Sequence, residues 1–394
     1  MANSALMHTY GRLPVAFVEG KGAWLTDTDG KTYLDALAGI AVCGLGHAHP
    51  AVTQAISEQA SRLIHTSNIY QVPLQEAAAR KLSQLSGMDS IFFCNSGAEA
   101  NEGAIKLARL HGHNKGIDIP HVLVMDNAFH GRTLATLTAT GNRKVQIGFE
   151  PLVSGFVRSA YNDLAAATHL VEHNKSITAI LVEPVQGEGG LTPATDEFMN
   201  GLRQLCDKHD LLLMLDEVQT GNGRTGYFYA YQRYDWKPDV LTTAKGLGNG
   251  FPIGAVMAHG KAANLFQPGH HGSTYGGTPL GSAVVLAVLE TLEKEQLAKR
   301  AGELGARIVQ EFTANFANIN GVKAVRGRGL MMGIELDQPC GELVQLALEQ
   351  GLLINVTAGQ VVRLLPPLTL TDEEADLLIS KLSQLIKNWL ASRS

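Results

Sequence analysis

Two apolar segments that each end in one charged residue constrain this chain most. Leu211–Leu215 run directly into Asp216, and the dipeptide Val240-Leu241 leads through three small residues to Lys245. Apolar runs of this kind are typical of strands buried on both faces of a parallel sheet. Because a buried charge is costly unless it is paired, Asp216 and Lys245 each require a partner.

The charges of these two residues indicate a kind of site. Open α/β sheets bind ligands just outside the carboxyl ends of their strands. A lysine and an acid at that edge fit a pyridoxal phosphate (PLP) site, where lysine forms a Schiff base and the acid pairs with the pyridinium nitrogen. Taken singly, Asp216 is more often a cap or turn residue, and Lys245 is more often a solvated loop lysine. The PLP interpretation therefore depends on the rest of such a site being present elsewhere.

One motif indicates a different cofactor. Residues 221–226, GNGRTG, match the dinucleotide-binding pattern G-x-G-x-x-G. In that pattern the glycines open an amphipathic helix, whereas here the aromatic segment YFYAY follows at residues 227–231. We therefore discount the alternative that the chain is an NAD-dependent dehydrogenase. A measurement of nicotinamide cofactor binding would test that alternative.

The order of the predicted elements indicates the fold. Strand-like and helical segments alternate over residues 90–260, which is typical of a mostly parallel sheet with helical crossovers. Residues 14–35 predict a small antiparallel unit around the Asp29-Gly30 turn, and residues 253–258 predict an edge strand. Helices are expected over residues 50–64 and 280–316.

Residues 322–364 and a C-terminal helix from Asp372 predict a second unit. We therefore expect an α/β fold with a mostly parallel central sheet and a second, smaller α/β domain. The expected division is an N-terminal segment of the small domain (1–49), a large cofactor-binding domain (50–290) and a C-terminal small domain (291–394).

A candidate anion site follows the predicted strand Ser90–Cys94. Ser96, Gly97 and Ala98 open a helix there, and free N–H groups at a helix N-terminus attract anions. The compatible alternative is that Ser96 is an N-cap, with Glu99 completing a capping box.

Other candidates are individually weak. Phe129 follows a strand and could stack on a planar ring, and Arg132 could bind a carboxylate through two parallel hydrogen bonds. Singly, the first is more often core and the second a surface charge. The acids Glu183 and Glu188 lie beside glycines after another strand, and Arg363 stands between apolar residues. Ser273 and Thr274 lie in a glycine-rich loop that either binds phosphate or is a plain loop.

Composition excludes several functions. The net charge of −5 argues against a nucleic-acid or anionic-membrane surface. No apolar run reaches the roughly 18 residues of a membrane span, and the N-terminus resembles neither a signal nor a transit peptide. The four scattered cysteines fit reduced thiols in a cytoplasmic protein. His47 and His49 lack a third ligand at suitable spacing, so we expect a structural turn and no metal.

Six motifs together carry a family resemblance. They are SGAEANE, NAFHGRT, EPVQGEGG, LDEVQTGNGRTG, TTAKGLGNGFP and HGSTYGG, in that order along the chain. The chain resembles the class III PLP-dependent aminotransferases, which have the fold-type I architecture, and within them the acetylornithine-specific group. The likeness extends over nearly the whole chain.

The resemblance implies roles around the cofactor. Lys245 would hold PLP and later carry the proton, while Asp216 would keep the pyridine nitrogen protonated. Gln219 would bond the phenolic oxygen, and the ring would lie between Val218 and Phe129. The phosphate would be bound by Ser96, Gly97 and Ala98, and by Thr274 of a neighbouring subunit, so a homodimer with shared active sites is implied.

The resemblance also implies substrates. Arg132 would bind a substrate carboxylate, with Ser273 nearby, and Glu188 would pair with Arg363 until 2-oxoglutarate displaces it. Ile40 stands where ornithine aminotransferases carry an aromatic residue, which favours N-acetylornithine as donor, with 2-oxoglutarate and glutamate as the second pair. The alternatives are another ω-amino donor (succinylornithine, ornithine or 4-aminobutyrate), a PLP aminomutase, or a catalytically silent relative.

Overall fold

The computed structural model describes residues 5–393, and its centre is a seven-stranded sheet. In spatial order its strands are β4 (Ser90–Cys94), β12 (Gly254–Ala258), β11 (Val240–Thr243), β10 (Leu212–Asp216), β7 (Ile177–Val182), β5 (His121–Met125) and β6 (Phe156–Ser159). All run in one direction except β12, which is antiparallel to both neighbours. The predicted mostly parallel α/β sheet is confirmed.

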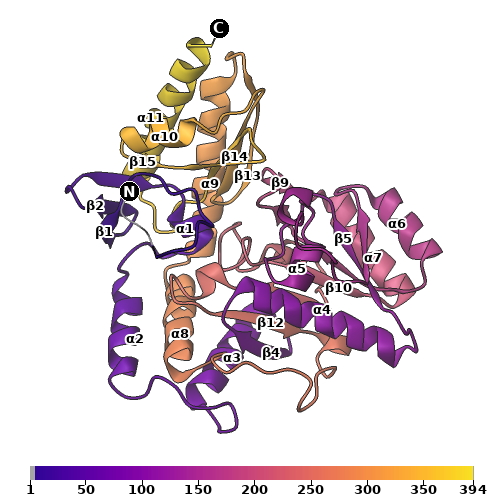
Figure 1. Ribbon diagram of the computed structural model, residues 1–394. Helices are drawn as coiled ribbons and strands as arrows, with labels where there is room; N and C mark the ends of the chain where they lie inside the picture. Colours follow the sequence, from indigo (N-terminus) through magenta and orange to yellow (C-terminus); the bar gives the residue numbers. More distant parts are fainter. Residues whose placement is uncertain (1–4, 394) are drawn as a thin grey trace.

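Helices cover both faces of this sheet, which explains the uninterrupted apolar strands (Figure 1). Along β10, Leu212 and Met214 belong to one core, and Leu213 and Leu215 belong to the other. One core includes α4 (Gly97–Asn114) and α5 (Leu134–Ala139); the other includes α3 (Pro73–Ser86), α6 (Leu164–His173), α7 (Asp196–His209) and α8 (Pro279–Lys294). Because helices cover both faces of the sheet, a polar side chain at the end of a central strand is also shielded from solvent.

The strand β12 corrects one expectation. Residues 253–258 were expected at the edge of the sheet, but β12 lies between β11 and β4. All five residues of this strand are buried. A strand that is buried on both faces shows no alternation of apolar and polar residues. The sequence therefore does not distinguish an internal strand from an edge strand here.

The C-terminal part is a second α/β layer, which Figure 1 shows above the central sheet. Its sheet has the order β13 (Val322–Arg328), β14 (Met331–Leu336), β17 (Val361–Leu364) and β16 (Asn355–Thr357). The accompanying helices are α9 (Leu297–Phe316), α10 (Leu343–Glu349) and α11 (Asp372–Ala391). One apolar core joins this sheet to α9 and α11, and it also takes side chains from α8.

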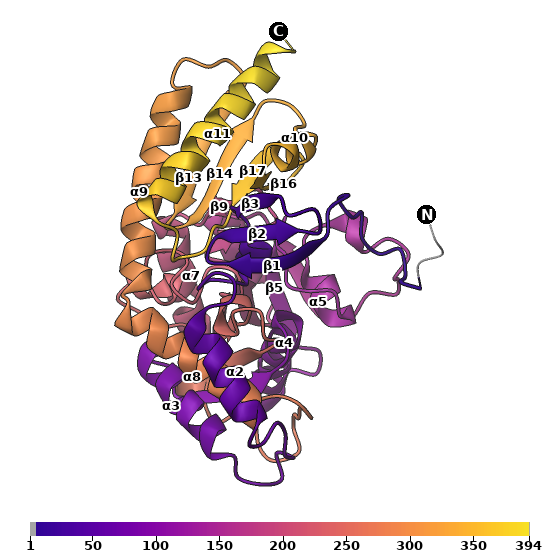
Figure 2. The same cartoon turned by 90° about the vertical axis from the view of Figure 1, so that its left-hand side faces the viewer.

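The N-terminal strands pack beside this C-terminal part (Figure 2). The predicted antiparallel unit is formed by β1 (Phe17–Lys21), β2 (Trp24–Asp27) and β3 (Thr32–Asp35), and β3 pairs in parallel with β15 (Leu352–Leu353). The two ends of the chain therefore share one sheet. The domain limits expected from the sequence stay a prediction.

Short elements and helix ends complete the description. They are α1 (Ala38–Ala41), α2 (Pro50–Ala60), β8 (Val185–Gln186), β9 (Thr192–Pro193), η1 (Arg143–Val145), η2 (Ala230–Arg233), η3 (Lys245–Leu247) and η4 (Gly260–Ala262). The expected helix over 50–64 is shorter than predicted. The expected helical region over 280–316 is interrupted at Gln296, whose φ of 51° breaks it into α8 and α9. Over residues 5–393, no helix is long and apolar enough to cross a membrane.

Candidate active site

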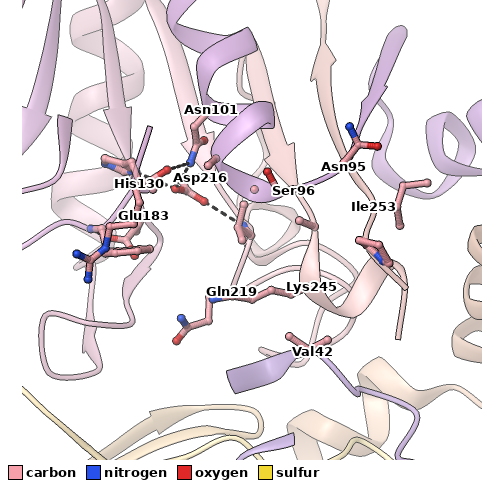
Figure 3. Close-up of a pocket in the computed structure, with 18 of the residues that line it drawn as sticks. Val42, Asn95, Ser96, Asn101, His130, Glu183, Asp216, Gln219, Lys245 and Ile253 are labelled. Atoms are coloured by element: carbon pink, nitrogen blue, oxygen red, sulfur yellow. Dashed lines mark hydrogen bonds and ion pairs between the residues drawn. The ribbon is translucent and has the colours of Figure 1, made fainter. Parts of the chain in front are cut away.

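A cavity of about 390 Å³ lies at the carboxyl ends of β10 and β11 (Figure 3). Most of the residues expected to hold a cofactor line it: Ser96, Gly97, Ala98, Phe129, Asp216, Val218, Gln219 and Lys245. Arg132 lines it as well. Segments far apart in the sequence therefore meet at this edge of the sheet, as the strand order requires.

Asp216 is held by three donors. Its Oδ2 atom accepts a hydrogen bond from Nδ2 of Asn101 at 2.7 Å and lies 2.7 Å from Nδ1 of His130. Its Oδ1 atom accepts from the backbone N–H of Val218 at 3.0 Å. Because a carboxylate only accepts, Nδ1 of His130 carries the proton. These contacts fix the direction of the carboxylate toward the cavity.

Asn101 and His130 were not singled out from the sequence. Asn101 lies one helical turn after Gly97, and its own Oδ1 accepts from the hydroxyl of Thr242 at 2.8 Å. His130 directly follows Phe129, just beyond the end of β5. A polar residue at that place is the sequence feature that could have indicated it. Its Nε2 is buried without a hydrogen-bond partner among residues 5–393.

Lys245 begins the short helix η3 one residue beyond the end of β11, with a φ of 44°. Burial, and next the positive charge of Arg363, lower the pKa of Lys245 from 10.5 to about 8. The side-chain amide of Asn222 fixes the preceding segment by donating to the Thr243 hydroxyl at 3.0 Å and the Ala244 carbonyl at 3.2 Å. A lysine with this pKa is partly neutral near neutral pH.

The N-terminus of α4 faces the same cavity. Ser96 is the N-cap, and its hydroxyl accepts from the backbone N–H of Glu99 at 3.2 Å. Glu99 differs from the expected capping box, because its carboxylate accepts from Asn95 instead of the N–H of Ser96. A Cβ atom on Gly97 would lie 2.7 Å from Val218, so only glycine fits there. Free N–H groups at this helix start suit a phosphate.

Gln219 and Phe129 both line the cavity and have contacts of their own. Oε1 of Gln219 accepts from Nη1 of Arg363 at 3.4 Å. Phe129 is half-buried, and its backbone N–H donates to Glu183 at 3.1 Å. Burial, and then the charge of Asp216, raise the pKa of Glu183.

Glu188 and Arg363 form the ion pair that the resemblance implied, with Oε1 and Nη1 2.5 Å apart. The Arg363 side chain is 1% exposed, whereas that of Glu188 is 39% exposed. Nε of Arg363 donates to Oδ1 of Asn355 at 2.9 Å. The carboxylate is therefore partly open to solvent, whereas the guanidinium is enclosed. Arg132 is exposed, with its guanidinium carbon 5.6 Å from the ring centroid of Phe129.

Glu188 and Arg363 do not themselves line this cavity and adjoin it through Gln219, and three further expected residues lie elsewhere. Ser273 and Thr274 do not line this cavity: the Ser273 hydroxyl accepts from Asn95 at 3.2 Å, and Thr274 is exposed. Ile40 was expected at the substrate wall, but Val42 lines the cavity there and Ile40 packs against a small core that includes Leu365. The reason is the left-handed backbone of α1, where Ile40 has a φ of 66°.

Two further motifs make structural contacts of their own. His47 binds Asp35 at 2.8 Å, and residues 5–393 contain no group of three or more metal-ligating side chains. The GNGRTG segment is followed by a loop and the short helix η2, so it lacks the helix of a dinucleotide site.

Comparison with known proteins identifies the family. The family model described as Aminotransferase class-III matches residues 6–386. This chain belongs to that family. It is 53% identical to the acetylornithine aminotransferase of Nitrosomonas europaea, over 99% of both chains. It is 55% identical to acetylornithine aminotransferase 1 of Bordetella pertussis, over 99% of this chain and all of the relative.

Solved structures of the family have the same fold. The acetylornithine aminotransferase from Elizabethkingia anophelis superposes with a TM-score of 0.86 at 35% identity, covering 96% of this chain and 95% of that one. An ornithine aminotransferase from Toxoplasma gondii, described with partial occupancy of PLP, gives a TM-score of 0.95 at 33% identity, over 99% and 93%. The fold is therefore that of the PLP-dependent aminotransferases.

The enzyme is a PLP-dependent aminotransferase, and the site fits that cofactor. It offers a buried lysine with a lowered pKa, a carboxylate held by three donors, and a helix start where a glycine permits close approach. Each matches one chemical group of PLP: the aldehyde, the ring nitrogen and the phosphate.

Proposed function

We propose that this enzyme transfers the δ-amino group of N2-acetyl-L-ornithine to 2-oxoglutarate, giving N-acetylglutamate 5-semialdehyde and glutamate in arginine biosynthesis. The observation that carries the reaction type is Lys245, a buried lysine with a lowered pKa in the same cavity as the anchored Asp216. The donor is supported by two relatives named acetylornithine aminotransferase, which are 53% and 55% identical to this chain.

Each residue has a proposed task. Bound PLP supplies an electron sink for the carbon from which a proton is removed. Lys245 would hold the cofactor, and its neutral amine would move the proton, a kind of catalysis that typically contributes about 10²- to 10⁴-fold. Asp216 binds the ring nitrogen, with Asn101 and His130 orienting its carboxylate. Gln219 donates to the phenolic oxygen.

The remaining walls position the ring and the phosphate. Val218 and Phe129 would pack against the ring, and the N–H groups at Gly97 and Ala98, with Ser96, would hold the phosphate. The family assigns these tasks, and all five residues line the cavity.

Two arginines would let one pocket take two substrates in turn. Arg132 binds the carboxylate of the donor at the mouth of the cavity. Arg363 stays paired with Glu188 while a neutral acylated donor is present, because a bare cation would need a counter-charge. When 2-oxoglutarate enters, the Glu188 side chain moves toward solvent. Arg363 then binds a carboxylate of 2-oxoglutarate in its place.

We also propose a cytoplasmic homodimer with shared active sites. Ile69, Tyr70 and Tyr275 are 80%, 67% and 65% exposed. Contacts join their two segments, since the rings of His65 and Tyr275 are 5.5 Å apart and Asn68 donates to the Ser273 carbonyl. Contiguous exposed apolar side chains of this size support a protein interface. Ser273 and Thr274, which lie outside their own cavity, would reach the site of the partner.

A donor panel tests the substrate. With 2-oxoglutarate as acceptor, we expect kcat/KM to be highest for N-acetylornithine, compared with ornithine, succinylornithine and 4-aminobutyrate. A preference for another donor would replace the proposed substrate and leave the family intact. An aminomutase, the second candidate, would turn over without 2-oxoglutarate. Light scattering of the purified protein tests the dimer.

A further inference from the structure

The hairpin formed by β8 and β9 carries Glu188 in its loop and reaches the C-terminal sheet. Its two strands pair antiparallel, and residues 187–191 connect them. The hairpin lies against that sheet, with β9 beside β13 (Figure 1, Figure 2). Leu191 is fully buried in a small core that includes Met331 of β14. The loop that carries Glu188 is therefore packed on the same sheet that carries Arg363.

Two arginines of this sheet lie in one row across its strands. Arg326 of β13 is directly opposite Gly333 of β14, and Gly333 is directly opposite Arg363 of β17. Residues directly opposite each other in antiparallel strands share one face of the sheet. The glycine between the arginines makes room for the loop, because a Cβ atom on Gly333 would lie 3.0 Å from the Cβ atom of Leu191. The loop therefore approaches the sheet between two cations.

Arg326 binds the backbone of the loop, whereas Arg363 binds its acid. Nε of Arg326 donates to the carbonyls of Gly190 at 3.2 Å and Leu191 at 3.1 Å, and its Nη2 donates to the Gly190 carbonyl at 2.6 Å. Nη1 of Arg326 pairs with Glu335 at 2.6 Å. The planar guanidinium is thus fixed on one side by a carboxylate and holds two loop carbonyls on the other.

A second contact holds the residue that carries the acid. The Thr357 hydroxyl of β16 donates to the backbone carbonyl of Glu188 at 2.6 Å. The loop backbone is therefore bound at Glu188 itself and again two residues further on, at Gly190. With the backbone held at these points, the Glu188 carboxylate moves by rotation about its own side-chain bonds. Arg363 lies within that range, because it belongs to the sheet that holds the loop.

We propose that Arg326 is a positioning residue for the Glu188–Arg363 pair. It holds the loop where the Glu188 carboxylate meets Arg363 while N-acetylornithine is bound, so that only a side chain has to move when 2-oxoglutarate enters. This role rests on the two-substrate switch proposed above. Without Arg326 the loop has more conformations and the pair forms less often. A bare Arg363 beside a neutral donor is unfavourable, so the enzyme loses affinity for the donor and not for the acceptor.

The test compares the two half-reactions of the enzyme by stopped-flow absorbance. N-acetylornithine is mixed with the PLP form and 2-oxoglutarate with the amino form, which gives an apparent Kd for each substrate. Arg326→Gln should raise the ratio of the donor Kd to the acceptor Kd by about threefold to tenfold, within the range for residues coupled in one hydrogen-bond network.

Arg328→Gln is the matched control. Arg328 lies two residues along the same strand and is 26% exposed, against 23% for Arg326. It also donates to a backbone carbonyl of the hairpin segment, but to that of Ala194 at 3.0 Å, just after β9 and six residues from Glu188. This variant removes the same charge and the same kind of bond, and it should leave the ratio unchanged.

Two further variants separate positioning from a general structural defect. In the Glu188→Gln background, Arg326→Gln should cause no additional change in the ratio, because no carboxylate remains to be positioned. A structural defect would change the ratio equally in both backgrounds. Arg326→Lys keeps a charge beside Glu335 but loses the guanidinium fork. It should give a smaller change in the same direction, and it decides the test if Arg326→Gln does not fold.

The outcomes distinguish this role from the switch on which it rests. If Glu188→Gln leaves the ratio unchanged, the switch is wrong and the role of Arg326 is overturned with it. If Glu188→Gln changes the ratio but the folded Arg326 variant does not, only the positioning role is overturned. An equal change in Arg328→Gln, or an undiminished effect of Arg326→Gln in the Glu188→Gln background, would overturn it as well.

Discussion

The lowered pKa of Lys245 predicts how the cofactor-free enzyme takes up PLP. Only the neutral amine attacks an aldehyde. At about pH 7.5, an amine with a pKa near 8 is roughly one quarter neutral, against about one thousandth for a pKa of 10.5. The rate of PLP uptake should therefore rise with pH, bend near 8 and become flat well below 10.

The cause of the lowered Lys245 pKa predicts how a substitution at Arg363 would change it. After burial, the charge of Arg363 lowers this pKa most, while Glu188 raises it. Arg363→Gln removes the first effect and leaves the second, so the bend should move upward by about one pH unit, equivalent to ~1.4 kcal/mol. Lys323→Gln is the control, because this exposed residue is not among the groups that shift Lys245.

The assay is stopped-flow absorbance of PLP binding between pH 6 and 10. A lysine model amine, measured in parallel, corrects for titration of PLP itself. A rate that still rises steeply up to pH 10 in the unmodified enzyme, or no movement of the bend in Arg363→Gln, would refute the electrostatic account of the site.

The same shift has a consequence for stability. Between about pH 8 and 10.5 the unfolded lysine binds a proton that the folded one does not. The contribution of Lys245 to the free energy of unfolding therefore increases across that window. Urea titrations of the cofactor-free enzyme should show a shallower increase in Lys245→Met, and an identical slope would contradict this assignment.

Three substitutions test other parts of the account. Asn101→Ala removes a hydrogen bond to the Asp216 carboxylate, worth about 1.5–3 kcal/mol, and should lower kcat about 10- to 100-fold; an unchanged kcat would exclude an orienting role. Glu188→Gln should raise KM for N-acetylornithine more than for 2-oxoglutarate in steady-state assays, and equal changes would argue against the switch. Gly305→Ala should lower stability in urea unfolding, because its Cβ would lie 2.0 Å from the Gly329 carbonyl oxygen; a gain, as helix propensity alone predicts, would contradict this.

Local sequence patterns predicted the elements that carry the chemistry. The apolar runs before Asp216 and Lys245 became β10 and β11, which lie side by side in parallel. Their charged ends meet because parallel strands end at one edge of the sheet. The helix after Ser96 and its N-cap were predicted by the same kind of local chemistry.

The orientation of β12 was within reach of the sequence but was missed. Only ten residues separate Thr243 from Gly254, and a parallel crossover needs about a dozen or more. This short connection favours an antiparallel neighbour. The partners of Asp216 were not accessible in this way, because Asn101 lies 115 residues away and no local pattern links them. Val42 lines the cavity where Ile40 was expected, because the left-handed backbone at Ile40 changes which side chain faces the cavity.

The most direct test of the proposed reaction is the half-reaction with N-acetylornithine in the absence of any acceptor. The PLP-loaded enzyme should lose the visible absorbance of the lysine-bound cofactor, gain that of its amino form, and recover the first spectrum when 2-oxoglutarate is added. If N-acetylornithine leaves the spectrum unchanged while another ω-amino donor converts it, the proposed substrate is wrong. If no donor converts it, transamination at Lys245 is contradicted.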